Sequence, residues 1–140
     1  MGVYTIAGDD SHYAKWLEKE LKQEFKQPYA CMGIMDGSDL IAVTMYHDYV
    51  PLHSIQASFA SISPRWATRN TLRRMFAYPF RQMSVKIMYA IVAHKNTKNN
   101  EIMKRIGFSL DGVIRNYYNE GEDDASWYSM KKNECKWLEA

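Results

Sequence analysis

The segment from Lys86 to Ala93 constrains the fold more than any other part of the chain. Apolar side chains occupy both alternating sets of positions along it: Ile87, Tyr89 and Ile91 on one, Met88 and Val92 on the other. Because a β-strand directs successive side chains to opposite faces, this strand has an apolar surface on each side. Such strands lie inside sheets that are covered on both faces. The sequence therefore predicts a central strand in a layered α/β structure.

The rest of the chain supplies the neighbouring elements. Alternating or apolar runs predict strands at 3–7, 30–35, 40–49, 53–63, 109–118 and 125–132, and helical spacing predicts helices at about 13–25, 67–83 and 96–106. Pro79 predicts a kink or a restart of the second helix. The resulting order, β-α-β-β-β-α-β-α-β-β, describes a mixed central sheet of six to seven strands flanked by three to four helices. With 140 residues and no internal repeat or linker, we expect one domain over residues 1–140.

Charge and composition exclude several classes of protein. The 18 Lys and Arg residues against 16 Asp and Glu give a net charge of +2, too little for the broad positive surface of a duplex-binding protein. The chain has no apolar run near the ~20 residues of a membrane span and no signal-peptide pattern at its start, so we expect a cytoplasmic protein with no membrane partner. Cys31 and Cys135 have neither metal-ligand spacing nor a secreted disulfide pattern. We expect both cysteines to be reduced and packed, and no metal site.

A short motif in the second half of the chain defines a helix end. Asn96 can cap the helix that follows it, and Gly107 can end that helix in the left-handed conformation. Phe108 would then fold back onto Ile102 or Met103.

The stretch from Asn96 to Phe108, followed by Leu110, Gly112 and Arg115, resembles a pattern of GNAT-family N-acetyltransferases: N-x-x-S, a spacer, G-F, then L-x-G-x-x-R. The pattern is that of enzymes related to those that acetylate ribosomal-protein N-termini. The stretches 65–80 and 127–138 resemble a small subgroup from phages and prophages. The likeness covers roughly residues 40–138. It implies the GNAT fold, acetyl-CoA as cosubstrate and transfer of acetyl to a primary amine by direct attack in a ternary complex, in the host cytoplasm if the protein is phage-encoded.

Acetyl-CoA needs a site that neutralises its diphosphate, and helix N-termini do this with free N–H groups. The resemblance implies a diphosphate cradle where the turn after Pro64 enters the helix at Thr68, with charge added by Arg65 and Arg69. Pantetheine would lie in a gap between the strand ending at Ser63 and the strand ending at His94. The expected contacts are Ser61, Ile62, Ser63, Arg65, Trp66, Ala67, Thr68, Arg69, Asn70, Asn96, Asn99, Met103 and Arg105.

Several of these positions carry individual expectations. The resemblance implies that a backbone N–H near Ile62 stabilises the oxyanion. Asn99 stands where the family has Ser, and Arg105 can reach the adenosine phosphate. Asn96 is also explained as a plain helix cap, and Arg105 as a cation at a helix C-terminus. Met103 stands where many relatives have a tyrosine that protonates the departing thiolate.

The general base is sought among groups that can take a proton from an amine. His53 and Asp48 rank first, because they lie where one strand passes to the next, followed by Tyr117 and Tyr118. The plainer interpretations are a surface-turn histidine for His53 and edge-strand packing for the two tyrosines.

Two alternatives stay open. The expected cradle lacks the family's glycines, since none occurs between Gly37 and Gly107, and Met103 replaces the tyrosine. These departures favour a catalytically degenerate GNAT-fold binding or host-interaction protein of phage origin. A helix with several arginines beside Trp66 could instead bind nucleic-acid phosphate, although the near-neutral charge argues against it. A homodimer is compatible with the sequence but is not required by it.

Overall fold

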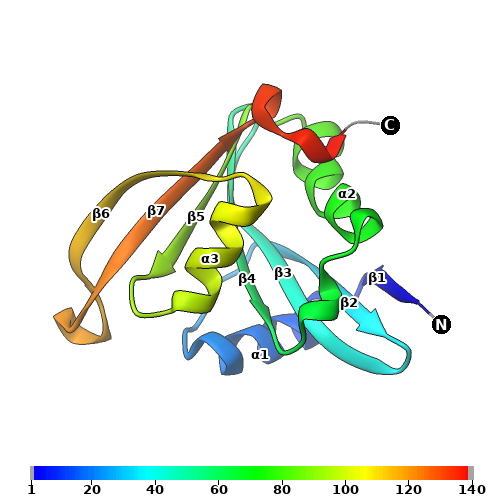
Figure 1. Cartoon of the computed structure of the whole chain (residues 1–140), viewed down its shortest axis with the longest axis horizontal. Helices are drawn as coiled ribbons and strands as arrows, with labels where there is room; N and C mark the ends of the chain where they lie inside the picture. The colour runs from blue at the N-terminus through cyan, green and yellow to red at the C-terminus, as the bar shows by residue number, and fades with distance from the viewer. Residues whose placement is uncertain (1, 139–140) are drawn as a thin grey trace.

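In the computed structural model, which describes residues 2–138, seven strands form one sheet and three α-helices pack on it (Figure 1). The elements in chain order are β1 (Val3–Ala7), α1 (Asp10–Leu21), β2 (Tyr29–Asp36), β3 (Asp39–Val50), β4 (Ser54–Ser61), α2 (Arg69–Ala77), β5 (Ile87–Ala93), α3 (Thr97–Ile106), β6 (Ser109–Tyr118) and β7 (Asp123–Lys131). This is the predicted order, and the mixed α/β class is confirmed.

The strands lie in the order β1-β2-β3-β4-β5-β7-β6. Every neighbouring pair is antiparallel except β4 and β5, which are parallel and joined through α2. Helix α1 covers one face of the sheet, where it packs on Met45, while α2 and α3 cover the other face, where they pack around Tyr46. Because adjacent residues of β3 reach opposite cores, the sheet is the middle of three layers.

Two predicted helices end earlier than expected. Helix α1 stops at Leu21 because Lys22 is left-handed (φ 56°) and the Glu18 carboxylate accepts a 2.8 Å hydrogen bond from the Phe25 N–H. Helix α2 stops at Ala77, and a π-helical turn at Tyr78–Gln82 follows. The predicted change of path at Pro79 is therefore confirmed.

The predicted caps of α3 are also confirmed. Asn96 Oδ1 accepts a hydrogen bond from the Asn99 N–H at 3.1 Å, and Gly107 ends the helix with φ 111°. The Phe108 N–H then donates to the Met103 carbonyl at 3.0 Å, which folds the chain back onto the helix. Met103 is buried in the core with Phe108 and Ile106. Its side chain lines none of the cavities described below, and its contact with the cofactor stays a prediction.

Cys31 and Cys135 are both free and buried, as predicted, and burial raises the pKa of the Cys31 thiol to about 12. Within residues 2–138, no three His, Cys, Asp or Glu side chains are grouped closely enough to hold a metal ion. No helix in that same range is long and apolar enough to cross a membrane.

Candidate active site

The parallel strands β4 and β5 pair at one end only. Their register runs through Ser54↔Ile87, Ile55↔Met88 and Gln56↔Tyr89. Beyond these pairs, β4 continues to Ser61 and β5 to Ala93 while the strands diverge, with α3 packed beside the opening (Figure 1). The gap expected from the resemblance is present in the fold. We call the paired part the closed end and the diverging part the open end.

The backbone of β4 turns every second residue towards this opening. In an antiparallel pair, alternate residues direct both N–H and C=O to the partner strand. The Ile62 N–H donates to the Ile41 carbonyl at 2.8 Å, on the β3 side. The Ile62 N–H is therefore already bonded to β3, and the backbone donor expected near Ile62 has to come from a neighbouring residue. The groups that face the opening belong to Phe59 and Ser61.

Two side chains of α3 replace part of the missing strand pairing. Asn99 Nδ2 donates to the Phe59 carbonyl at 2.7 Å, and Lys98 Nζ donates to the Ser61 carbonyl. Asn99 is only 4% exposed, and its Oδ1 has no hydrogen-bond partner among the described residues. Since a buried acceptor without a partner costs about 1–3 kcal/mol, this oxygen is suited to accept a hydrogen bond from a ligand.

Two cavities adjoin the open end. The gap cavity, of about 270 Å³, lies between the strands and is lined by Leu21, Lys22, Gln23, Ala57, Ser58, Phe59, Ala90, Ile91, Val92, Ala93, Asn96, Asn99, Tyr117 and Tyr118. The α3 cavity, of about 540 Å³, lies between the end of β4 and α3. It is lined by Ser61, Ile62, Ser63, Pro64, Trp66, Ala67, Lys98, Glu101, Ile102, Arg105 and Ile106.

The predicted cofactor-binding residues divide between these cavities and other positions. Six of them line the α3 cavity: Ser61, Ile62, Ser63, Trp66, Ala67 and Arg105. Asn96 and Asn99 line the gap cavity. Met103 and four further residues line neither cavity. The four lie at or just before the start of α2: Arg65, Thr68, Arg69 and Asn70.

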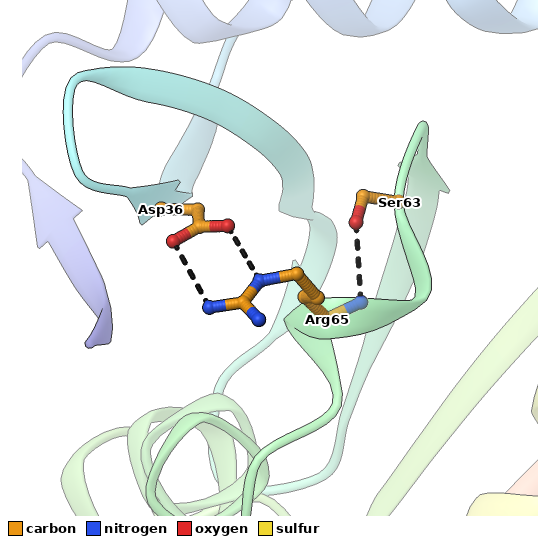
Figure 2. A network of polar contacts seen from close by, with 3 residues as sticks. All are labelled: Asp36, Ser63 and Arg65. Carbon is orange, nitrogen blue, oxygen red and sulfur yellow. Dashed lines mark hydrogen bonds and ion pairs between the residues drawn. The ribbon is translucent and has the colours of Figure 1, made fainter. Parts of the chain in front are cut away.

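Arg65 is bound elsewhere. Figure 2 shows its guanidinium against the Asp36 carboxylate at the end of β2, with Nε 2.6 Å from Oδ2 and Nη2 3.4 Å from Oδ1. The Arg65 N–H also donates to Ser63 Oγ at 3.2 Å. The guanidinium charge is paired with Asp36, and the expected role of Arg65 in the diphosphate cradle stays a prediction. The pair ties the β4–α2 connection to the β2–β3 hairpin.

Trp66 lines the α3 cavity and does not line the gap cavity between the strands. Its side chain is 3% exposed and packs on Phe59 with ring centroids 4.6 Å apart. Thr68 accepts a 3.1 Å hydrogen bond from the Thr71 N–H and so caps α2. Arg69 and Asn70 lie exposed in the first turn of that helix.

His53, the first-ranked base, lies outside the site. It is exposed in the turn before β4, and its carbonyl accepts hydrogen bonds from the Lys86 and Ile87 N–H groups at the closed end. Five residues of strand, or roughly 16 Å, separate it from Ser58 at the gap cavity. Sequence pattern could not place His53, because a turn next to a strand can lie at either end of the site and pattern alone does not say which end opens.

Asp48 takes part in a group that sequence reasoning missed. Its Oδ2 lies 2.8 Å from His47 Nδ1, and His47 Nε2 lies 2.8 Å from Ser58 Oγ. Burial lowers the pKa of His47, and the hydrogen bond to Asp48 partly opposes that shift. The available signal was a histidine inside a predicted strand, directly before an acidic residue.

Tyr117 and Tyr118 both line the gap cavity. The Tyr118 hydroxyl donates to the Ile91 carbonyl at 3.3 Å, and burial raises the pKa of that phenol to about 12. A phenol with so high a pKa stays protonated at neutral pH and donates hydrogen bonds. Tyr118 is therefore unsuited to act as a base.

Comparison with known proteins finds similarity in structure rather than in sequence. No family model matches the chain, and no curated protein is significantly similar to it. A probable acetyltransferase superposes with a TM-score of 0.66 at 19% identity over 77% of this chain. The superposed part is 64% of that protein, so this chain spans less than two thirds of its length. The spermidine/spermine N-acetyltransferase SpeG from Vibrio cholerae, in mutant form, gives 0.72 at 14% identity over 97% of both chains. A GNAT-family acetyltransferase from Bacillus anthracis gives 0.70 at 11% identity, over 96% of this chain and 97% of that one. The protein therefore has the fold of GNAT acetyltransferases.

Proposed function

We propose that the protein transfers an acetyl group from acetyl-CoA to a primary amine, which attacks directly within a ternary complex. The observation that carries this proposal is the divergence of β4 from β5, because it leaves the edge of β4 without a backbone partner beside the buried Asn99 Oδ1, which has no hydrogen-bond partner among the described residues. The fold shared with acetyltransferases supports the same function.

The open end fits the pantetheine arm of acetyl-CoA chemically. The arm carries amide groups, each with a carbonyl that accepts and an N–H that donates. The Phe59 and Ser61 N–H groups would donate to the carbonyls, and Asn99 Oδ1 would accept from an amide N–H. When bound, acetyl-CoA supplies an activated thioester carbonyl. The same two backbone N–H groups are the ones available to stabilise negative charge on that carbonyl oxygen.

The diphosphate would lie at the α3 cavity. Lys98 and Arg105 bring positive charge to it, and both can form charge-assisted hydrogen bonds. Glu101 opposes them in part. The first turn of α2, with Arg69 and Asn70, adds the positive end of a helix dipole nearby. In this arrangement Arg105 and Lys98 carry the role that the sequence suggested for Arg65.

The amine acceptor would approach the gap cavity from the α1 side. That side is lined by the end of α1 and by Tyr117 and Tyr118, so donor and acceptor would reach the opening from opposite faces of the sheet. Acceptors to test are protein N-termini, lysine side chains and small amines, including spermidine because one structural neighbour is named for it.

A second candidate function is binding without catalysis, as in a phage-encoded interaction protein. The buried Met103, at the position of the family's tyrosine acid, favours it.

Calorimetric titration with acetyl-CoA, followed by an assay of thiol release with a panel of primary amines, separates the two functions. The transferase proposal requires binding and amine-dependent thiol release, with the acetylated amine detected by mass spectrometry. Binding without turnover would favour the second function, and no heat at millimolar acetyl-CoA would exclude the transferase.

A further inference from the structure

Three polar side chains form a continuous hydrogen-bonded chain on the α1 face of the sheet. Ser58 Oγ lies 2.8 Å from His47 Nε2, and His47 Nδ1 lies 2.8 Å from Asp48 Oδ2. Since a carboxylate can only accept, the proton of the neutral imidazole is on Nδ1 and Nε2 accepts from the serine hydroxyl. Every donor in the chain therefore points from Ser58 towards Asp48.

A β-bulge creates this alignment. In a regular strand, His47 and Asp48 would point to opposite faces of the sheet. The register between β3 and β4 shifts between His47 and Val50, and Asp48 takes the left-handed conformation with φ 52°. Non-glycine residues rarely adopt this conformation, and bulges often redirect side chains beside active sites. The distortion places the carboxylate beside the imidazole.

The chain runs from the gap cavity to a second, more open cavity. Ser58 lines the gap cavity and is 8% exposed. His47 and Asp48 line a neighbouring space of about 250 Å³, which we call the His47 cavity, and their side chains are 10% and 65% exposed. The two cavities share walls at Gln23, Ile91, Tyr117 and Tyr118. A proton accepted at Ser58 thus has a bonded route out of the gap.

We propose that Ser58, His47 and Asp48 form a proton relay that removes the proton released by the attacking amine. This inference rests on the proposed acetyl transfer. As the amine nitrogen bonds to the thioester carbon and the C–S bond breaks, the sulfur leaves as the thiolate with the electron pair of that bond. The amine proton passes to Ser58 Oγ, and the serine proton passes to His47 Nε2. Asp48 stabilises the resulting imidazolium, which loses its proton to water through the His47 cavity.

The surroundings of His47 suit a proton acceptor. Burial and the edge of the Phe25 ring, 5.3 Å from the imidazole centroid, keep the resting imidazole neutral and lower its pKa, while Asp48 favours the charged form. The other ionisable groups lining the His47 cavity are Glu24 and Lys26 from the loop after α1, and Tyr117 and Tyr118 from β6. The acidic and basic members of the loop offset each other, so Asp48 is the main charged influence.

The relay is tested with Ser58→Ala and His47→Gln, with His53→Gln as the matched control because that histidine is exposed at the closed end of β4. Acetyl-CoA binding is measured by calorimetry, and kcat is measured from pH 5 to 9 with an amine that wild type accepts. We expect each relay variant to lower kcat by about 100-fold, the scale of general acid–base catalysis, with unchanged acetyl-CoA affinity. The fall of wild-type kcat at acidic pH should disappear in His47→Gln and persist in His53→Gln.

The outcomes separate the relay from the function on which it rests. Wild type without turnover on any amine overturns both proposals. Turnover in wild type with a full rate, or an unchanged acidic limb, in His47→Gln overturns the relay alone. A lower kcat with the acidic limb intact also overturns it, because a purely structural histidine would act in that way.

Discussion

The two ends of the β4–β5 pair use the same two strands in opposite ways. At the closed end, Ser54 to Gln56 pair with Ile87 to Tyr89, and the His53 carbonyl accepts hydrogen bonds from the N–H groups at the start of β5 and just before it. At the open end, Lys98 and Asn99 reach across from α3 to bond the β4 backbone. The closed end satisfies its polar groups with backbone, whereas the open end satisfies them with side chains.

This difference teaches where binding capacity comes from. Backbone pairing leaves no donor or acceptor for a ligand, so the closed end can only hold the strands together. The side-chain bonds at the open end are incomplete, because Asn99 uses its amide nitrogen and leaves its oxygen free. A ligand that donates a hydrogen bond to this oxygen gains binding free energy, whereas the paired backbone of the closed end has no free group to offer a ligand.

We expect the largest effect from filling the open end with a bulky side chain. Ala93→Trp would place an indole in the gap cavity of about 270 Å³, whereas Lys86→Trp would add the same side chain at an exposed position beside the closed end. We expect Ala93→Trp to lower kcat/KM by at least about 100-fold, because small displacements of bound substrate already cost that much. Lys86→Trp should match wild type. Equal activity in all three proteins would mean that the opening binds no substrate.

A smaller effect tests whether the chemistry of the open end extends to β3. Asp48→Asn keeps a hydrogen-bond acceptor beside His47 but removes the charge that raises the pKa of the imidazole. Because the base must be neutral, wild-type kcat falls as the pH drops through the lowered pKa of His47. The variant's fall should lie at still lower pH, with kcat about tenfold below wild type at neutral pH. An NMR titration of His47 measures the shift directly, and a shift to higher pH would contradict it.

Two neighbouring asparagines of α3, Asn99 and Asn100, give a paired test of the open end. Asn100 is fully bonded: Nδ2 donates to the Asn96 carbonyl at 2.8 Å, and Oδ1 accepts from the Tyr128 hydroxyl at 2.5 Å. Asn99→Ala and Asn100→Ala should each lower the free energy of unfolding by about 1–3 kcal/mol, because each leaves buried groups unpaired. Only Asn99→Ala should also weaken acetyl-CoA binding, by about tenfold.

Chemical denaturation and calorimetry measure the two effects separately. Equal acetyl-CoA affinity in the two asparagine variants would show that the orphan oxygen contacts no ligand.

The sequence predicted what local patterns determine. Alternation located the strands, and Asn96 with Gly107 located α3, because caps and side-chain periodicity act within a few residues. It did not predict which β4 amides face the opening, since that depends on the register with β3. For this reason the expectation of a donor near Ile62 named no particular amide.

Contacts between segments far apart in the sequence could not be predicted from local patterns either. Arg65 and Asp36 are 29 residues apart, and His47 and Ser58 are 11 residues apart. Both contacts require the hairpins to be folded. The contact of His47 with Asp48 depends in addition on the bulge that follows His47, which no sequence pattern predicted. The sequence-based ranking of candidate bases, which relied on the position of His53 and Asp48 between two strands, therefore did not include His47.

The smallest expected effect separates the two arginines that the sequence treated alike. Arg65 is bound to Asp36 on the exposed surface, whereas Arg105 lines the α3 cavity without an ion pair among the described residues. Arg105→Ala should weaken acetyl-CoA binding by about three- to tenfold, and less at high salt, because an exposed charge acts on the phosphates through screened attraction. Arg65→Ala should leave the affinity unchanged at every salt concentration. If Arg65→Ala were the weaker binder, the diphosphate would lie at the start of α2, and the open end would extend along the β4–α2 connection instead of towards α3.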